Sequence, residues 1–173
     1  MSTEATPVPA HLASEFFVWL WWRSEQQEGR VDLPEPIGPV TVWVDDRLAF
    51  RRPDDTKVTA VITGESPSNT LEARAALAGG KVVQELRFGL RRDDREFTAT
   101  LKAPGLGIGQ LKLPQVLSES AADAIRDRVF LYEEFAMVVG GLLTTFAEAR
   151  TGDAWRSTLL PELREWLAGG ASD

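Results

Sequence analysis

The sequence has 173 residues, of which 43% are hydrophobic and 26% charged, with no cysteine and a formal net charge of −7. This length and composition fit one folded domain and exclude a disordered or collagen-like chain, and the lack of cysteine excludes disulfides and thiolate metal sites. The first residues show no signal-peptide pattern, and no apolar run approaches the ~20 residues that cross a bilayer. We therefore expect a cytoplasmic protein without membrane insertion.

The N-terminal part of the chain predicts a tail followed by an aromatic helix. Residues 1–10 are small, polar and interrupted by Pro7 and Pro9, so we expect a flexible tail there, and a second one at 169–173. A helix is expected from Leu12 to about Glu28. Its centre, the run FFVWLWW at 16–22, has no polar side, so two surfaces should cover it. The second surface is either another helix of the same chain or a partner subunit.

Short strands are expected through the middle of a single domain over 11–168. Alternating apolar residues predict a tight hairpin at 40–50 that turns at Asp45-Asp46, and a strand at 58–63. A short helix from Leu71 to Leu77 should follow. A second hairpin is expected over 81–101 with its turn at Asp93-Asp94, and a last strand at 110–113.

The C-terminal part predicts a long amphipathic helix at about 121–150 and a short final helix. Apolar residues recur at steps of three and four, and a second set of apolar positions widens this face. The first set is Ile125, Val129, Tyr132, Ala136, Val139, Leu143 and Phe146; the second is Leu131, Phe135, Val138 and Leu142. Gly140 and Gly141 would allow a close approach of another backbone, or a bend.

These elements define the fold class as α+β. We expect an antiparallel or mixed sheet of about five to six short strands, packed by the aromatic N-terminal helix and the long C-terminal helix. A core built this way should bury one apolar residue set from each element. That set is Trp19, Val42, Leu86, Phe88, Leu101, Val129 and Leu143.

No residue pattern predicts catalysis, so we expect neither an enzyme nor a cofactor or metal. The single histidine, His11, has no cysteine or second histidine to share a metal or complete a triad. The glycines at 105, 107 and 109 do not have the spacing of a dinucleotide fingerprint. Glu133 and Glu134 diverge by about 100° on a helix, and no further carboxylates join them.

Only residues 81–112 are net basic, at +3, from seven basic and four acidic residues. Strand alternation places several of the basic residues on one polar sheet face, where they would contact phosphates. The candidate DNA-binding residues are Arg47, Arg51, Arg87, Arg91, Lys102 and Lys112. The alternative is that these side chains lie on a solvated face and contribute little to stability. The broad apolar surfaces also favour an oligomer, with candidate interface residues Phe17, Trp21, Trp22, Gly140 and Gly141.

Three segments resemble the C-terminal half of the recombination-associated protein RdgC family: LASEFFVWLWWRSE, EARAALAGGKVVQELRFGL, and the strands that lead to GQLKLP. The resemblance covers about residues 10–147. Its most specific pieces are Trp19 with Arg23-Ser24, and Gly80-Lys81-Val82-Val83.

The resemblance implies a homodimer closed into a ring, sequence-independent binding of duplex DNA and restraint of recombination. Because family members are about twice as long, either a partner chain supplies the other half or the fold serves a different task. We therefore carry two expectations for function. One is an RdgC-like, non-catalytic, DNA-associated module. The other is a protein-interaction or adaptor domain that keeps the fold without binding DNA, which the acidic net charge favours.

Overall fold

A computed structural model describes residues 10–169 of the chain. The expected tails lie outside the described residues, except that Ala10 begins the first helix and Gly169 ends the last. The helices are α1 (Ala10–Glu25), α2 (Leu71–Ala78), α3 (Ala121–Thr151) and α4 (Leu160–Gly169), with short helical turns at Gln27–Gly29, Pro67–Asn69 and Trp155–Leu159. The strands are β1 (Arg30–Asp32), β2 (Pro39–Arg51), β3 (Val58–Thr63), β4 (Val82–Arg92), β5 (Arg95–Lys102) and β6 (Gly107–Lys112).

The six strands form one antiparallel sheet, so the expected α+β class is confirmed. The strand order is β1-β2-β4-β5-β6, and β3 pairs with the same edge of β2 as β1 does, but at the other end of that strand. The second predicted hairpin is confirmed as β4 and β5, and Asp93 at its turn has a φ of 55°. The short strand β1 was not predicted from the sequence.

The predicted hairpin at 40–50 is wrong, because these residues form the single long strand β2. Asp45 and Asp46 do not turn the chain back; they belong to a bulge in the pairing of β2 with β4. Val44 pairs with Phe88 and Leu48 pairs with Leu86, so three residues of β2 lie opposite Arg87 alone. A bulge of this kind bends the strand and increases its twist without ending it.

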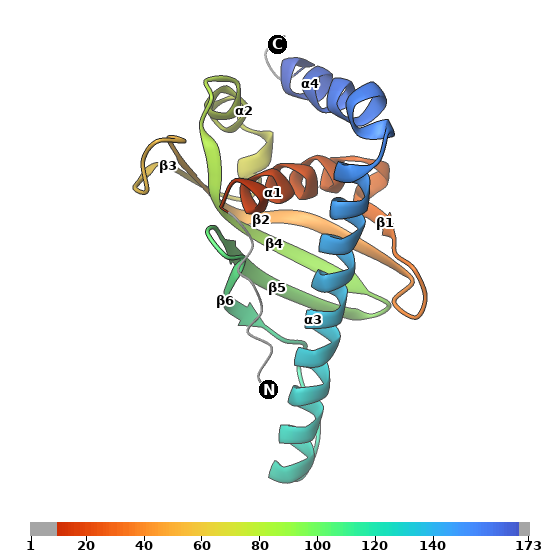
Figure 1. The fold of residues 1–173 in the computed structure, drawn as a ribbon. Helices are drawn as coiled ribbons and strands as arrows, with labels where there is room; N and C mark the ends of the chain where they lie inside the picture. Colours follow the sequence, from red (N-terminus) through yellow and green to blue (C-terminus); the bar gives the residue numbers. More distant parts are fainter. Residues whose placement is uncertain (1–9, 170–173) are drawn as a thin grey trace, which may run out of the picture.

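Helices α1 and α3 cover one face of the sheet (Figure 1). The aromatic run of α1 is buried between this face and the C-terminal helices of the same chain, which is the first of the two arrangements expected for it. The rings of Phe16 and Trp19 lie 5.5 Å and 5.7 Å from that of Phe146 on α3. The Trp21 indole meets Trp166 of α4 edge-on at 5.1 Å.

Helix α3 contacts the core through the whole second set of apolar residues and, from the first set, through Val139 and Phe146 in its C-terminal half. Leu131, Phe135, Val138 and Leu142 are buried, and the Phe135 ring packs against Phe88 and Phe97. Of the seven residues expected in the core, five are buried, Leu143 is half-buried, and Val129 is 52% exposed. The expectation for Val129 is wrong because α3 extends beyond the edge of the sheet (Figure 1), where no strand lies beneath it.

Candidate functional site

The sheet face opposite α1 and α3 is polar, and Arg87 lies at its centre. We call it the polar face and define it by the side chains of Trp43, Asp45, Arg47, Arg87, Thr98, Thr100, Lys102, Gln110 and Lys112. Strand alternation produces it, since Leu86 and Phe88 on either side of Arg87 point into the core. Arg87 is only 8% exposed, so it is not the solvated side chain that the sequence suggested.

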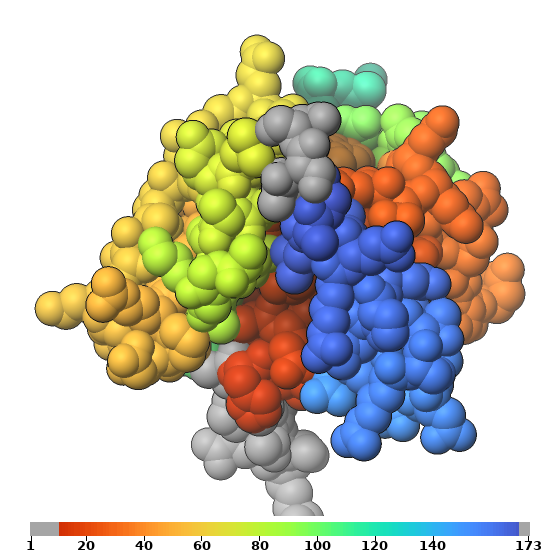
Figure 2. Space-filling view, turned by 90° about the horizontal axis from the view of Figure 1, so that it is seen from above, coloured from red at the N-terminus to blue at the C-terminus, as the bar shows by residue number. Residues whose placement is uncertain are grey.

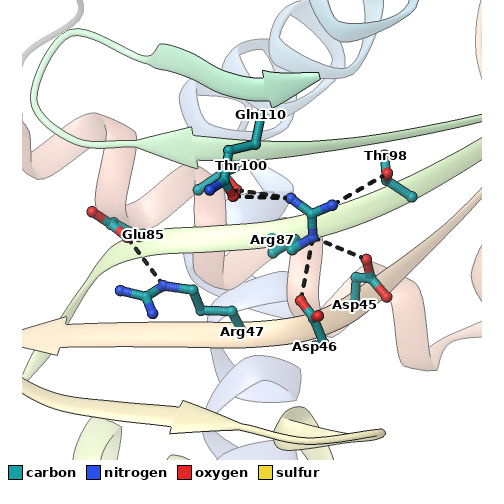
Figure 3. Close-up of polar contacts among 8 residues, drawn as sticks. All are labelled: Asp45, Asp46, Arg47, Glu85, Arg87, Thr98, Thr100 and Gln110. Carbon is teal, nitrogen blue, oxygen red and sulfur yellow. Dashed lines mark hydrogen bonds and ion pairs between the residues drawn. The ribbon is translucent and has the colours of Figure 1, made fainter. Parts of the chain in front are cut away.

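The bulge in β2 explains the surroundings of Arg87. With three residues of β2 opposite it, two consecutive carboxylates reach the same guanidinium, and Nε lies 3.2 Å from Oδ2 of Asp45 and from Oδ1 of Asp46. On the other side Nη1 donates to Thr100 Oγ1 at 3.3 Å and to Gln110 Oε1 at 3.2 Å (Figure 3). These contacts use most of the donors of Arg87 within the chain, which leaves little of its charge for a phosphate.

The other predicted DNA-binding arginines also have partners within the chain. Arg47 Nε lies 3.3 Å from Oε2 of Glu85 (Figure 3), and Arg91 lies 3.8 Å from Glu96. Arg51 Nε donates to Gln84 at 2.8 Å, and its Nη1 donates to carbonyl oxygens of the connection to β3. These side chains therefore organise the sheet and its loops.

Lys102 and Lys112 differ from the four arginines. Both are exposed, and neither forms an ion pair within residues 10–169. A cavity of about 820 Å³ opens beside Lys112 on the polar face. It is lined by Asp46, Arg47, Thr63, Gly64, Glu65, Arg87, Gln110, Leu111 and Lys112. The structure thus brings three of the six predicted basic residues, Arg47, Arg87 and Lys112, around one cavity that also contains carboxylates.

Three of the five predicted interface residues have no exposed surface to offer a partner. Phe17 and Trp21 are fully buried and Trp22 is 6% exposed. Gly141 receives a close contact from its own chain, since a Cβ there would lie 2.6 Å from Cδ1 of Ile37 in the connection between β1 and β2. Gly140 is different: it is exposed, and nothing lies within 4 Å of the position of its missing Cβ.

An exposed apolar surface lies on α3, the helix whose broad apolar face favoured an oligomer in the sequence, although Val129 was expected in the core. Ile125, Val129 and Tyr132 are 63%, 52% and 55% exposed. Ala136 is also exposed, whereas Val139 is buried and Leu143 half-buried, so the first apolar set is uncovered from Ile125 to Ala136. We call Ile125, Val129, Tyr132, Ala136 and Gly140 the α3 stripe, because steps of three and four place them along one side of the helix.

By length and composition alone, α3 could also cross a membrane, with a mean hydropathy of 1.4 over its most apolar window. In the fold, 39% of that window is buried. The buried part includes Glu134, which is ion-paired with Arg92 and Arg95 of the β4–β5 hairpin. A core helix of a soluble protein has the same length and composition, so this feature does not distinguish the two environments.

Comparisons with family models, with curated proteins and with solved structures find no match to this chain. Within the described residues, no three side chains of histidine, aspartate or glutamate come together in a group that could hold a metal ion. The polar face and the α3 stripe are therefore the two candidate surfaces for function.

Proposed function

We propose that this chain is a protein-interaction module that acts by binding, and that the α3 stripe docks onto the α3 stripe of a second copy. The observation that carries the proposal is the uncovered state of Ile125, Val129 and Tyr132 on a helix whose other apolar side is already in the core. A continuous apolar stripe along an exposed helix is typical of a helix–helix interface.

The small residues in the stripe support a helix as the occupant. Ala136 and Gly140 are both exposed and lie one turn apart. Because no atom lies within 4 Å of a Cβ at Gly140, another helix has space to approach closely there.

Charge supports a second copy as that helix. Over residues 121–130, around Ile125 and Val129, the chain carries two acids and two bases, so this part of the stripe is neutral although the whole chain is −7. Over 131–140 the one exposed charge is Glu133. A two-fold interface brings the same surface together twice, and a segment with equal numbers of acids and bases avoids like-charge repulsion in that arrangement. The resemblance to the RdgC family, which implies a homodimer, agrees with this proposal.

The test is the mass of the purified protein at ~50 µM by light scattering, a concentration at which a specific interface of ordinary size is occupied. We expect about 38 kDa, twice the 19.1 kDa of one chain. Val129→Asp should give a monomer. Phe130→Asp is the matched control, because Phe130 is as exposed, at 56%, but points away from the stripe. A monomeric wild type, or equal effects of the two variants, would contradict the proposal.

Duplex DNA is the second candidate partner, and the exposed Lys102 and Lys112 on the polar face support it. Because the four arginines have partners within the chain, we expect only about two phosphates to be neutralised, so affinity should be weak and fall with a salt slope near −2. Lys102→Ala/Lys112→Ala should abolish that slope, while Arg52→Ala/Lys57→Ala in the β2–β3 connection should preserve it. No binding to long duplex DNA at 50 mM salt would exclude this function.

A further inference from the structure

A groove between three helices lies on the opposite side of the molecule from the polar face. Seen along α3, α1 forms the floor of a hollow between α2 and the C-terminal segment that contains α4 (Figure 2). The groove has a volume of about 470 Å³. Its lining comes from α1, α2, the start of β4, the end of α3 and the C-terminal segment at 155–167. This volume is in the range of small-molecule sites.

The apolar part of the groove wall is aliphatic, apart from one indole. Val18 on α1, Leu77 on α2 and Leu163 on α4 come from three helices, and Trp155 lies in the turn before α4. A heteroaromatic ligand would bury ring nitrogens and oxygens against this wall without partners, which is unfavourable. An alkyl chain has no such groups, so the wall suits an alkyl chain.

One buried polar atom on the wall has no partner. Ser14 is 4% exposed, and its Oγ makes no hydrogen bond within the described residues. Buried hydroxyls are almost always hydrogen-bonded in folded proteins. A polar end group of a ligand in the groove would supply the missing partner, which indicates that the ligand is amphipathic.

The ionisable residues of the groove indicate the sign of the charge on that end group. Four of the five are basic types: His11, Lys81, Arg150 and Arg164. The single acid, Glu15, is ion-paired with Arg150 at 2.7 Å. Lys81 and Arg164 form no ion pair within residues 10–169, so the groove carries uncompensated positive charge in a protein of net charge −7.

We propose that this groove binds a fatty carboxylate, with the alkyl chain against Val18, Leu163 and Trp155 and the carboxylate attracted by Lys81 and Arg164. A free phosphate or acetate would be attracted by the basic residues but has no alkyl chain to pack against the wall. A fatty alcohol would pack against the wall but has no charge to attract the basic residues. The inference is independent of the α3 stripe and of DNA, since neither shares a residue with the groove.

The experiment measures dodecanoate binding to the full chain by calorimetry, below the concentration at which dodecanoate forms micelles. We expect saturable binding of one molecule per chain. Dodecanol should bind about tenfold more weakly, and acetate should not bind. Lys81→Ala/Arg164→Ala should reduce dodecanoate affinity about tenfold and leave dodecanol unchanged. Arg52→Ala/Lys57→Ala, which removes the same charge elsewhere, should have no such selective effect.

Two results would overturn the proposal. The first is no saturable binding of dodecanoate to the wild type. The second is equal affinity of the wild type and the Lys81→Ala/Arg164→Ala variant, which would show that the charged groove does not select a carboxylate. The variants replace side chains at the groove rim, and thermal unfolding checks that each still folds.

Discussion

The carboxylate of Glu134 lies 2.7 Å from Nη1 of Arg92, and this pair connects the middle of α3 to the end of β4. Arg95, at the start of β5, reaches the same Glu134 oxygen at 2.9 Å. The Glu134 side chain is 2% exposed, whereas those of Arg92 and Arg95 are 19% and 33% exposed. The pair thus lies at the point where α3 leaves the sheet, between the buried half and the projecting half of the helix.

We expect Glu134→Ala to lower the free energy of unfolding by about 3 kcal/mol, because it leaves two arginines facing a buried position without a carboxylate. Urea denaturation measures the change. Glu133→Ala is the matched control: Glu133 is the exposed neighbour, and its replacement should change stability by less than about 0.5 kcal/mol. Similar losses in both variants would mean that the pair does not fix α3 on the hairpin.

The role of Glu134 also shows where sequence reasoning stops. The spacing of apolar residues predicted α3 and its ends to within a residue. In the structure, Ser120 caps the helix by accepting from the backbone N–H of Asp123. It placed Val129 and Leu143 in the core, whereas the side of α3 that meets the sheet carries Leu131 and Phe135. Glu134 lies on that side and pairs with Arg92 and Arg95, which are distant in sequence, so local spacing does not reveal this contact.

The bulge at Asp45-Asp46 is a second case. Two aspartates between alternating apolar residues are typical of a turn, and locally nothing distinguishes a turn from a bulge. The deciding partner is Arg87, about forty residues away, which these carboxylates contact. For the same reason the alternation correctly placed Arg87 on the polar face but did not predict that its charge is used within the chain.

Arg87→Ala should therefore destabilise the fold, by about 2 kcal/mol, because it leaves adjacent carboxylates without their counter-charge and removes the hydrogen bonds that Arg87 donates to Thr100 and Gln110. Replacing Asp45 and Asp46 by asparagine in the same chain should recover part of the loss. Thermal unfolding of the four proteins of this cycle gives the coupling. Arg91→Ala is the control, since Arg91 is largely exposed and its Glu96 contact is long. If the loss from Arg87→Ala and the change from the two asparagine substitutions simply added, the bulge would not hold Asp45 and Asp46 against Arg87 as described.

Gly89 on β4 should be intolerant of any side chain, because the indole of Trp43 on the paired strand lies over it. A Cβ at Gly89 would overlap Cε2, Cζ2 and Nε1 of that ring. We expect Gly89→Ala to cost about 1–3 kcal/mol by overpacking. Trp43→Ala/Gly89→Ala should lose less than the sum of the two single variants, since removing the ring removes the clash. If denaturant titrations gave a loss for the double variant equal to the sum of the two single losses, the Trp43 ring would move aside freely.

The adjacent glycines of α3 should respond to alanine in opposite directions. Gly140 has no neighbour within 4 Å of a Cβ, so in the monomer Gly140→Ala should stabilise the helix by about 1 kcal/mol through helix propensity. At Gly141 the same Cβ would lie 2.6 Å from Cδ1 of Ile37 and 3.4 Å from Cδ1 of Leu33, so Gly141→Ala should destabilise despite the same gain in propensity. Urea denaturation in the Val129→Asp background, where self-association is removed, isolates this effect. In the wild-type background the added methyl at Gly140 would instead lie in the proposed interface and weaken the dimer. If Gly140→Ala and Gly141→Ala both raised the free energy of unfolding, the close approach of the β1–β2 connection to α3 would be contradicted.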